Sequence, residues 1–255
     1  MGNEDLGNLY RSIGELKASA KAFSRMRDYC TSSKHVAEMC LRIAVVSIEL
    51  QDWMAASSNA FKIQNLRLKP EDAPGMSSKS AVATGLASLA QGQYRAAAGA
   101  FLTVDPSLGN SFSEVVTPND VSVYGGLCAL AALDRAELQA RVLENSVFRS
   151  FLELEPHVRR AITLFCNSKY SQCLEILEAY KTDYLLDIHL QAQVPQLYQA
   201  VRSKCIVQYF IPFSCVTLAT MADVFATEEK VMEIELIHMI QEGALQARID
   251  TQKRV

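Results

Sequence analysis

The sequence predicts a mostly α-helical protein, in which a TPR-like (tetratricopeptide-like) solenoid of helical repeats precedes a winged-helix module with a small β-wing. Glycine and proline are sparse, at 11 and 7 of 255 residues, whereas a β-sandwich or barrel needs many turn residues. The first two thirds of the chain contain similar helical segments, and the last fifth alternates helices with short apolar stretches. We place the repeats in residues 1–193 and the winged-helix module in 194–255.

The repeat is defined by a turn followed by a helix that opens with a large apolar residue. Leu16, Trp53 and Tyr94 occupy this position, at intervals slightly longer than the TPR period. Gly14 and Gly92 match in the turn, and small residues farther along predict close packing of the paired helices. These small residues are Ala20, Ala56 and Ala97. A helical hairpin cannot bury its apolar face alone, so such units stack. A generic helical bundle with accidental self-similarity stays open as an alternative.

Two further features fit the repeat pattern, and one segment does not. Phe23 matches Phe101 one helix after the turn, and Tyr170 follows Tyr94 after about two periods. The intervening unit around 124–143 is helical but fits poorly.

Two segments rich in turn residues predict loops between helices. The first, Leu68–Ser80, combines Pro, Gly and Ser. The second, Asp105–Asp120, holds two prolines and is expected to cross the surface before Asn119 or Asp120 caps the next helix.

The winged-helix prediction depends on the order of elements after Pro212, which ends an apolar helical stretch. The segment 213–216 is expected to form a short strand, and Thr217 to cap a helix. Two apolar faces follow at helical spacing, and Gly243 sits where a helix should end. The first face is Leu218, Met221, Ala222 and Phe225, and the second is Met232, Leu236, Met239 and Ile240. Residues 245–249 then alternate as a strand.

The charge of this module argues against nucleic-acid recognition. Residues 216–255 carry seven acids and four bases, a net charge of −3, and the second helix is rich in glutamate. Nucleic-acid affinity comes from Lys and Arg on phosphates, which a helix of this sign would repel. We therefore predict a protein-docking module, although glutamates on a helix are often only a solvated face.

Cysteine usage and apolar segments indicate the compartment. The seven cysteines are scattered and never in C-x-x-C spacing, which favours reduced thiols over disulfides or zinc sites. The first 20 residues include five charged side chains, and the longest apolar run is too short to span a bilayer. We expect a soluble protein of the cytoplasm and nucleus with no membrane partner.

No pattern of catalytic residues is evident. The four histidines are far apart in sequence, and no H-E-x-x-H motif or glycine-rich phosphate loop is present. They are His35, His157, His189 and His238. A Cys–His pair can only be recognised in the fold, so that alternative stays open. Gly125 and Gly126 indicate close helix packing. We predict no enzyme activity, cofactor, metal or small-molecule substrate.

Several stretches together resemble the PCI family, named for the proteasome lid, the COP signalosome and translation initiation factor three. They are similar to the signalosome branch over nearly the whole chain. They are RDYCTSSKH (27–35), YGGLCALAALDRAEL (124–138), FLELEP (151–156), YLLDIHL (184–190), IVQYFIPFSCVTLATMADVF (206–225) and LQARID (245–250). The proteasome lid contains the nearest alternative, and a nucleic-acid-binding PCI adaptor is a second.

The resemblance implies a non-catalytic scaffold subunit. In the signalosome branch a different subunit removes the ubiquitin-like modifier from cullin–RING ubiquitin ligases. The implied partners are other PCI subunits of the signalosome, and cullin–RING ligases. The family pattern also implies that the chain begins inside its first repeat and lacks the family's C-terminal helix.

The predicted partner-binding residues lie in the winged-helix module. Residues 245–249 should have a free strand edge, because a second wing strand is shortened, and such edges invite pairing with another chain. Apolar residues on the outer flank of the second helix complete the prediction. The residues are Ile234, Ile237, Gln246, Ala247, Arg248 and Ile249.

Overall fold

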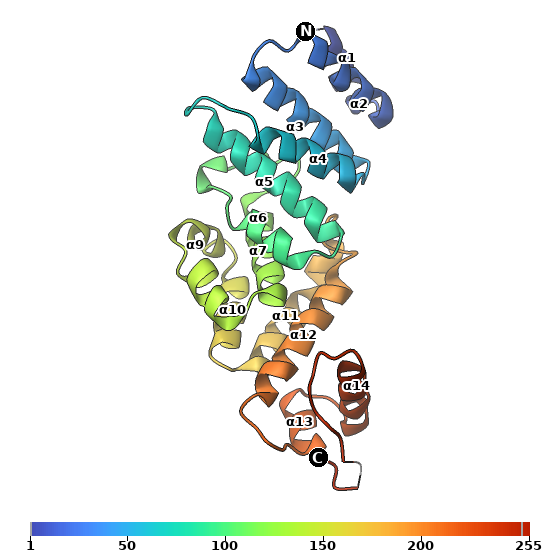
Figure 1. The fold of residues 1–255 in the computed structure, drawn as a ribbon, viewed down its shortest axis with the longest axis vertical. Coiled ribbons are helices and arrows are strands. Elements are labelled where there is room, and N and C mark those ends of the chain that lie inside the picture. Colours follow the sequence, from blue (N-terminus) through green and yellow to red (C-terminus); the bar gives the residue numbers. More distant parts are fainter. Residues whose placement is uncertain (1, 251) are drawn as a thin grey trace.

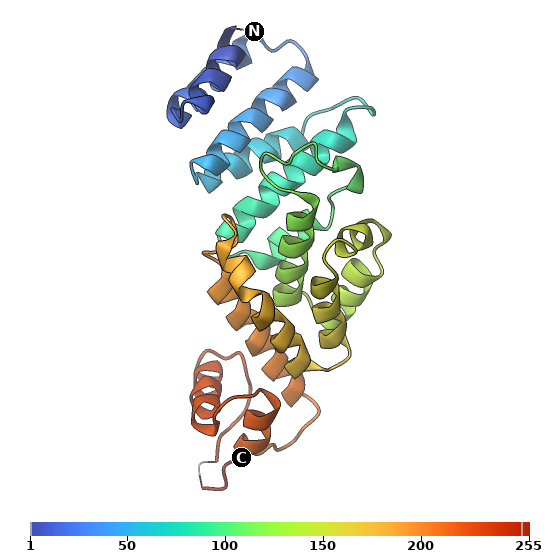
Figure 2. The ribbon, with the colours of Figure 1, turned by 180° about the vertical axis from the view of Figure 1, so that it is seen from behind.

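The computed structural model describes residues 2–250 and 252–255 as an elongated stack of helices, with the two termini at opposite ends (Figures 1 and 2). Four hairpins follow the predicted repeat. They are α1 (Gly2–Ser12) with α2 (Leu16–Arg25), α3 (Ser33–Glu49) with α4 (Trp53–Gln64), α5 (Ala73–Ala90) with α6 (Tyr94–Phe101), and α10 (Pro156–Cys166) with α11 (Tyr170–Leu186). Leu16, Trp53, Tyr94 and Tyr170 each open the second helix, as the repeat predicted.

The turn inside each hairpin has the same backbone geometry. A residue with positive φ precedes the second helix by two positions, and the next residue donates its N–H to a carbonyl five positions back. The residues are Gly14, Gln51, Gly92 and Ser168, with φ of 82°, 58°, 72° and 60°. The bonds are Glu15 to Tyr10, Asp52 to Ser47, Gln93 to Ser88 and Lys169 to Leu164, at 2.8–2.9 Å. This is the Schellman motif, which satisfies the last carbonyls of a helix.

Helix packing within two hairpins depends on a glycine facing a phenylalanine. A Cβ on Gly7 would lie 2.5 Å from the ring of Phe23, and one on Gly85 would lie 2.8 Å from the ring of Phe101. Both pairs occupy the same two positions of the repeat. These positions hold Ala44 and Ala60 in the second hairpin, and Ala161 and Leu177 in the fourth. In each hairpin at least one of the two residues is glycine or alanine, which permits close packing of the paired helices.

One predicted small residue is out of register. Ala56 and Ala97 are fully buried, but the first-hairpin residue at the same position is Ser19, not Ala20. Ser19 is also fully buried, and its hydroxyl donates a 2.8 Å hydrogen bond to the Gly7 carbonyl. Residue type alone favoured alanine, whereas a buried serine is accommodated because a neighbouring carbonyl accepts its proton.

The unit that fits the repeat poorly lies between the third and the fourth hairpin. It contains a helix that packs against four others, which we call the hub helix. Its first helix, α7 (Pro118–Ala132), packs against α6, α9, α10 and α12, while its second half is broken. The broken half consists of α8 (Arg135–Leu138), the π-helical η3 (Gln139–Leu143) and α9 (Ser146–Leu152). Cβ atoms on Gly125 and Gly126 would lie 2.8 Å from Phe148 and 2.3 Å from Val158. The prediction of close packing at these glycines is confirmed.

Two polar side chains, one buried and one half-buried, fix α7 to the helices that follow. The hydroxyl of Tyr124 donates a 2.7 Å hydrogen bond to Asp187. The ammonium of Lys204 on α12 donates to the carbonyls of Leu130 and Leu133 at the end of α7, and lies 4.5 Å from the ring centroid of Phe165. Burial lowers the pKa of Lys204 to about 8. The cation therefore caps a helix at its negative end.

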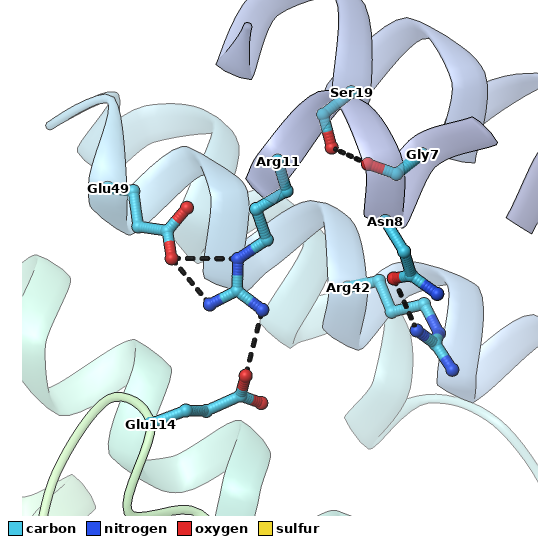
Figure 3. A network of polar contacts seen from close by, with 7 residues as sticks. All are labelled: Gly7, Asn8, Arg11, Ser19, Arg42, Glu49 and Glu114. Atoms are coloured by element: carbon cyan, nitrogen blue, oxygen red, sulfur yellow. Dashed lines mark hydrogen bonds and ion pairs between the residues drawn. The ribbon is translucent and has the colours of Figure 1, made fainter. Parts of the chain in front are cut away.

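A charged network joins the first hairpins to the loop that precedes α7 (Figure 3). Arg11 on α1 donates to Glu49 on α3 and to Glu114 in the loop, with both bonds at 2.8 Å. Arg42 on α3 donates to Glu4, at 2.6 Å, and to Asn8, at 3.0 Å. This loop also buries Phe112, so it is held to the stack by apolar contact as well as by charge.

Both predicted loops need correction. Residues 68–80 are a loop only as far as Asp72, because α5 begins at Ala73 with Pro74 in its first turn, a position where the missing N–H costs nothing. The cap of α7 is Thr117, not Asn119 or Asp120. Asp120 instead accepts from the Thr117 N–H and completes a capping box. Short 3₁₀ turns occupy η1 (Met26–Tyr29) and η2 (Pro106–Leu108).

The C-terminal module contains α12 (Val194–Phe210), α13 (Leu218–Val224) and α14 (Glu229–Gln241). Thr217 caps α13, as predicted, by accepting from the Thr220 N–H. Gly243 ends α14 with φ of 75°. The first predicted apolar face is buried throughout, whereas Ile240 of the second is only half-buried. Among the described residues, no helix is both long and apolar enough to cross a membrane.

The mostly α-helical class is confirmed, but the predicted β-wing is wrong. Neither 213–216 nor 245–249 is a strand, and the described part of the chain contains no sheet. The alternation of apolar and polar residues along 246–249 does correspond to two sides of the segment. Ala247 and Ile249 are half-buried, whereas Gln246 and Arg248 are exposed. A strand also requires a ladder of main-chain hydrogen bonds to a neighbour, and no neighbouring segment supplies one.

Substituting alanine for two helical glycines should have opposite effects on stability. We expect Gly85→Ala to lower the free energy of unfolding by about 1–3 kcal/mol, because the new methyl group overpacks the buried Phe101 ring. The control is Gly99→Ala on α6, whose Cβ would contact nothing within 4 Å, and which should gain up to about 1 kcal/mol from helix propensity. Urea unfolding measures both. A stabilised Gly85→Ala variant would contradict the close-packing account.

Candidate interaction surface

Within the C-terminal module, the part that contains α13 and α14 is held to α12 by aromatic and cationic contacts. The rings of Tyr209 on α12 and Phe225 after α13 meet edge to face, with centroids 5.6 Å apart. The guanidinium of Arg202 lies 5.8 Å from the centroid of the same Phe225 ring. Phe225 therefore contacts both a ring and a cation, which sets where α13 ends relative to α12.

Two of the glutamates that make α14 acidic form ion pairs inside the chain. Glu235 accepts from Arg202 through both carboxylate oxygens, with bonds of 2.8 Å from Nε and 3.0 Å from Nη2. Glu229 pairs with Arg254 at 3.2 Å. The Arg202–Glu235 pair is three-quarters buried and two-pronged, so it fixes α14 against α12. Sequence reasoning missed Arg202, which with Lys204 is one of the two charged residues of α12.

An apolar groove of about 340 Å³ lies among four segments of the module. They are the end of α12, the residues that lead into α13, the helix α14, and residues 245–250. Its lining is mostly hydrophobic. The apolar lining residues include Phe210, Leu218, Met221, Leu236, Ile240 and Leu245. The extended segment Gln246–Ile249 forms one wall, and Val255 also lines the groove. All four predicted residues of this segment therefore border the same groove.

The backbone of Gln246–Ile249 makes no hydrogen bonds to other described residues. The nearest main-chain bonds are Leu245 N–H to Met239, at 3.2 Å, and the pair between Asp250 and Val255, at 2.7 and 3.3 Å. Unpaired backbone amides are strong hydrogen-bonding groups that seek water or another chain. The predicted strand is absent, but an extended segment without a backbone partner is present where it was expected.

The other two predicted residues lie on a separate surface. Ile234 and Ile237 on α14 are 58% and 39% exposed, and neither lines the groove, which contacts Leu236 and Ile240 of the same helix. Val231, at 49% exposed, extends this stripe by one turn, because residues three apart share a helix face. Val231 was missed, although its spacing from Ile234 and Ile237 could have revealed it.

The histidines and cysteines form no evident catalytic arrangement among the described residues. His157 stacks on Tyr180, with centroids 3.8 Å apart, and its Nε2 is 2.7 Å from the Tyr184 hydroxyl. Burial lowers its pKa against the opposing effect of Glu155. Cys30 and His35 line the same pocket of about 660 Å³, yet no hydrogen bond joins them in the described structure. A nucleophile and its base need hydrogen-bond reach.

Comparison with known proteins now adds to this geometry. The model of the family described as 26S proteasome subunit RPN7 matches residues 1–141, and the PCI domain model matches residues 177–255. The chain belongs to the RPN7 family. The first match ends within η3 and the second begins within α11, so the groove lies inside the segment matched by the PCI domain model.

Similarity to individual curated proteins shows which members of the RPN7 family this chain resembles. COP9 signalosome complex subunit 1 of Emericella nidulans is 52% identical over 266 residues, which cover 100% of this chain and 53% of that protein. The protein of the same name from Arabidopsis thaliana is 43% identical, covering 100% of this chain and 57% of that protein. The rice 26S proteasome non-ATPase regulatory subunit 6 is 25% identical over 65% of this chain.

The predicted resemblance to the signalosome branch of the PCI family is therefore confirmed. This RPN7-family chain spans about half the length of the signalosome relatives that it matches. None of the comparisons tests the six predicted partner-binding residues individually, so their role stays a prediction.

The Arg202–Glu235 pair should contribute more to stability than the exposed Arg254–Glu229 pair. A double-mutant cycle with Arg202→Gln and Glu235→Gln should give a coupling energy of about 1 kcal/mol, because the pair is two-pronged and largely screened from water. The matched cycle with Arg254→Gln and Glu229→Gln should give about 0.3 kcal/mol or less, since Arg254 is mostly exposed. Equal couplings in urea unfolding would contradict this distinction.

Proposed function

We propose that this protein is a non-catalytic scaffold subunit of the COP9 signalosome, supporting deneddylation of cullin–RING ubiquitin ligases through protein–protein contacts. The observation that carries the proposal is the 52% identity over the whole chain to a protein named COP9 signalosome complex subunit 1. Helical repeats with a separate end module suit this role, because solenoids present extended binding surfaces. We place the protein in the cytoplasm and nucleus, a location compatible with its unpaired cysteines.

The groove supports a specific mode of assembly with a neighbouring PCI subunit. Gln246–Ile249 offers unpaired backbone groups beside an apolar cavity, the combination that a partner strand needs for main-chain bonds and side-chain pockets. The second contact is the stripe of Val231, Ile234 and Ile237, whose exposed apolar area favours burial by a partner.

Affinity purification of the chain from cells, followed by mass spectrometry, tests the scaffold role. We expect signalosome subunits to be recovered. Recovery of proteasome lid subunits in their place would overturn the proposal in favour of the lid, to which the rice relative belongs by name. A nucleic-acid adaptor would instead show tight, steeply salt-dependent binding in a filter assay.

Proline in the extended segment should weaken subunit association. Ala247→Pro removes a backbone N–H and restricts the chain, so recovery of neighbouring subunits should fall at least several-fold while helix content by circular dichroism is unchanged. The control is Ala247→Ser, because it makes a small side-chain change at the same position but keeps the backbone N–H group. Undiminished recovery with Ala247→Pro would count against a main-chain contact.

The isolated chain should have no deneddylase activity. The expectation rests on the scattered histidines and on the side-chain environment of His157, which is held by two tyrosines. The measurement is cleavage of a conjugate between a cullin and its ubiquitin-like modifier by purified protein, with a chelator as control. Cleavage that the chelator abolishes would show that the chain is a metalloenzyme.

A further inference from the structure

Positive charge is concentrated in residues 13–35, which run from the first turn through α2 to the start of α3. Residues 13–35 hold five bases and two acids, a net charge of +3, whereas the whole chain has a net charge of −3. The remaining residues therefore carry −6. Such segregation of charge indicates a surface that meets a partner of opposite sign.

Three of these bases form a single line along α2, which we call the α2 stripe: Lys17, Lys21 and Arg25. They are four residues apart, so they share one helix face at intervals of about 6 Å. All three are exposed, while Ala22 and Phe23 are buried on the opposite side. The sequence of α2 contains no acid that could neutralise the line from within the helix.

Neighbouring arginines are neutralised inside the chain, and the α2 stripe is not. Figure 3 shows Arg11 directed at Glu49 and Glu114. Arg42 forms an ion pair with Glu4 at 2.6 Å. Among the described residues, no carboxylate lies within 4 Å of the charged groups of the α2 stripe. The stripe keeps its full charge available to another molecule.

We propose that the α2 stripe binds an acidic polypeptide segment, with carboxylates spaced to match Lys17, Lys21 and Arg25. An acidic helix with Asp or Glu every fourth residue presents this spacing, so that three ion pairs form in register. A nucleic acid is disfavoured, because three cations over about 12 Å neutralise few phosphates. The −6 carried by the rest of the chain would also repel a longer polyanion.

This surface is independent of the proposed assembly groove. The α2 stripe lies at the N-terminal end of the stack, and the groove lies at the opposite end with α13 and α14 (Figure 1). A failure of one binding surface therefore leaves the other testable.

The test is fluorescence anisotropy with the full chain and a labelled alanine-rich peptide, long enough for several helical turns, that carries glutamate at every fourth position. We expect binding at low salt that weakens as ionic strength rises. The variant Lys17→Glu, Lys21→Glu, Arg25→Glu should bind at least about tenfold more weakly, because three ion pairs are replaced by repulsion. The control is Lys62→Glu, Arg67→Glu, Lys69→Glu, which makes the same charge change at exposed positions.

The control variant should change binding less than about twofold, which would show that location and not net charge decides the affinity. Equal losses in both triple variants would overturn the proposal, as would a wild-type chain that does not bind the peptide. A short single-stranded DNA that binds more tightly than the peptide, and loses binding in the α2 variant, would overturn it in favour of nucleic acid.

Discussion

The left-handed turn inside each hairpin is the constraint on which the rest of the fold depends. It reverses the chain within a few residues and ends the first helix with a hydrogen bond from the position after the turn residue. Glycine adopts this backbone freely at Gly14 and Gly92, but Gln51 and Ser168 adopt it at a cost of about 1–2 kcal/mol. That strain persists because helix packing on both sides fixes the turn. The paired helices then meet at the same positions in every hairpin.

The hub helix α7 shows how this regular stack is modified. Two consecutive glycines let Phe148 and Val158 approach its backbone, while the half-buried Lys204 donates hydrogen bonds to its last carbonyls. These contacts take the place of a continuous second helix in the unit between the third and the fourth hairpin. They also bring α12 against α7, so the C-terminal module is attached to the centre of the stack through one long helix.

Part of the charge of the molecule joins its own elements to one another. Arg11 and Arg42 join the first hairpins, and Arg202 fixes the acidic helix α14. The acidic character of α14 thus has a structural role. The two surfaces that we propose for binding lie at the two ends: the α2 stripe at one, and the unpaired segment Gln246–Ile249 with its groove at the other.

The sequence by itself determined the helical class, the hairpin positions and the resemblance to the PCI family, because periodicity and turn residues act over short distances along the chain. It also placed Gly243 and Thr217 correctly at helix ends. The tertiary structure alone decided that residues 245–249 form no strand, since a strand exists only with a partner that sequence alternation cannot supply. It also decided that Ile234 lies away from the groove, because a helix face is assigned only when its neighbours are in place.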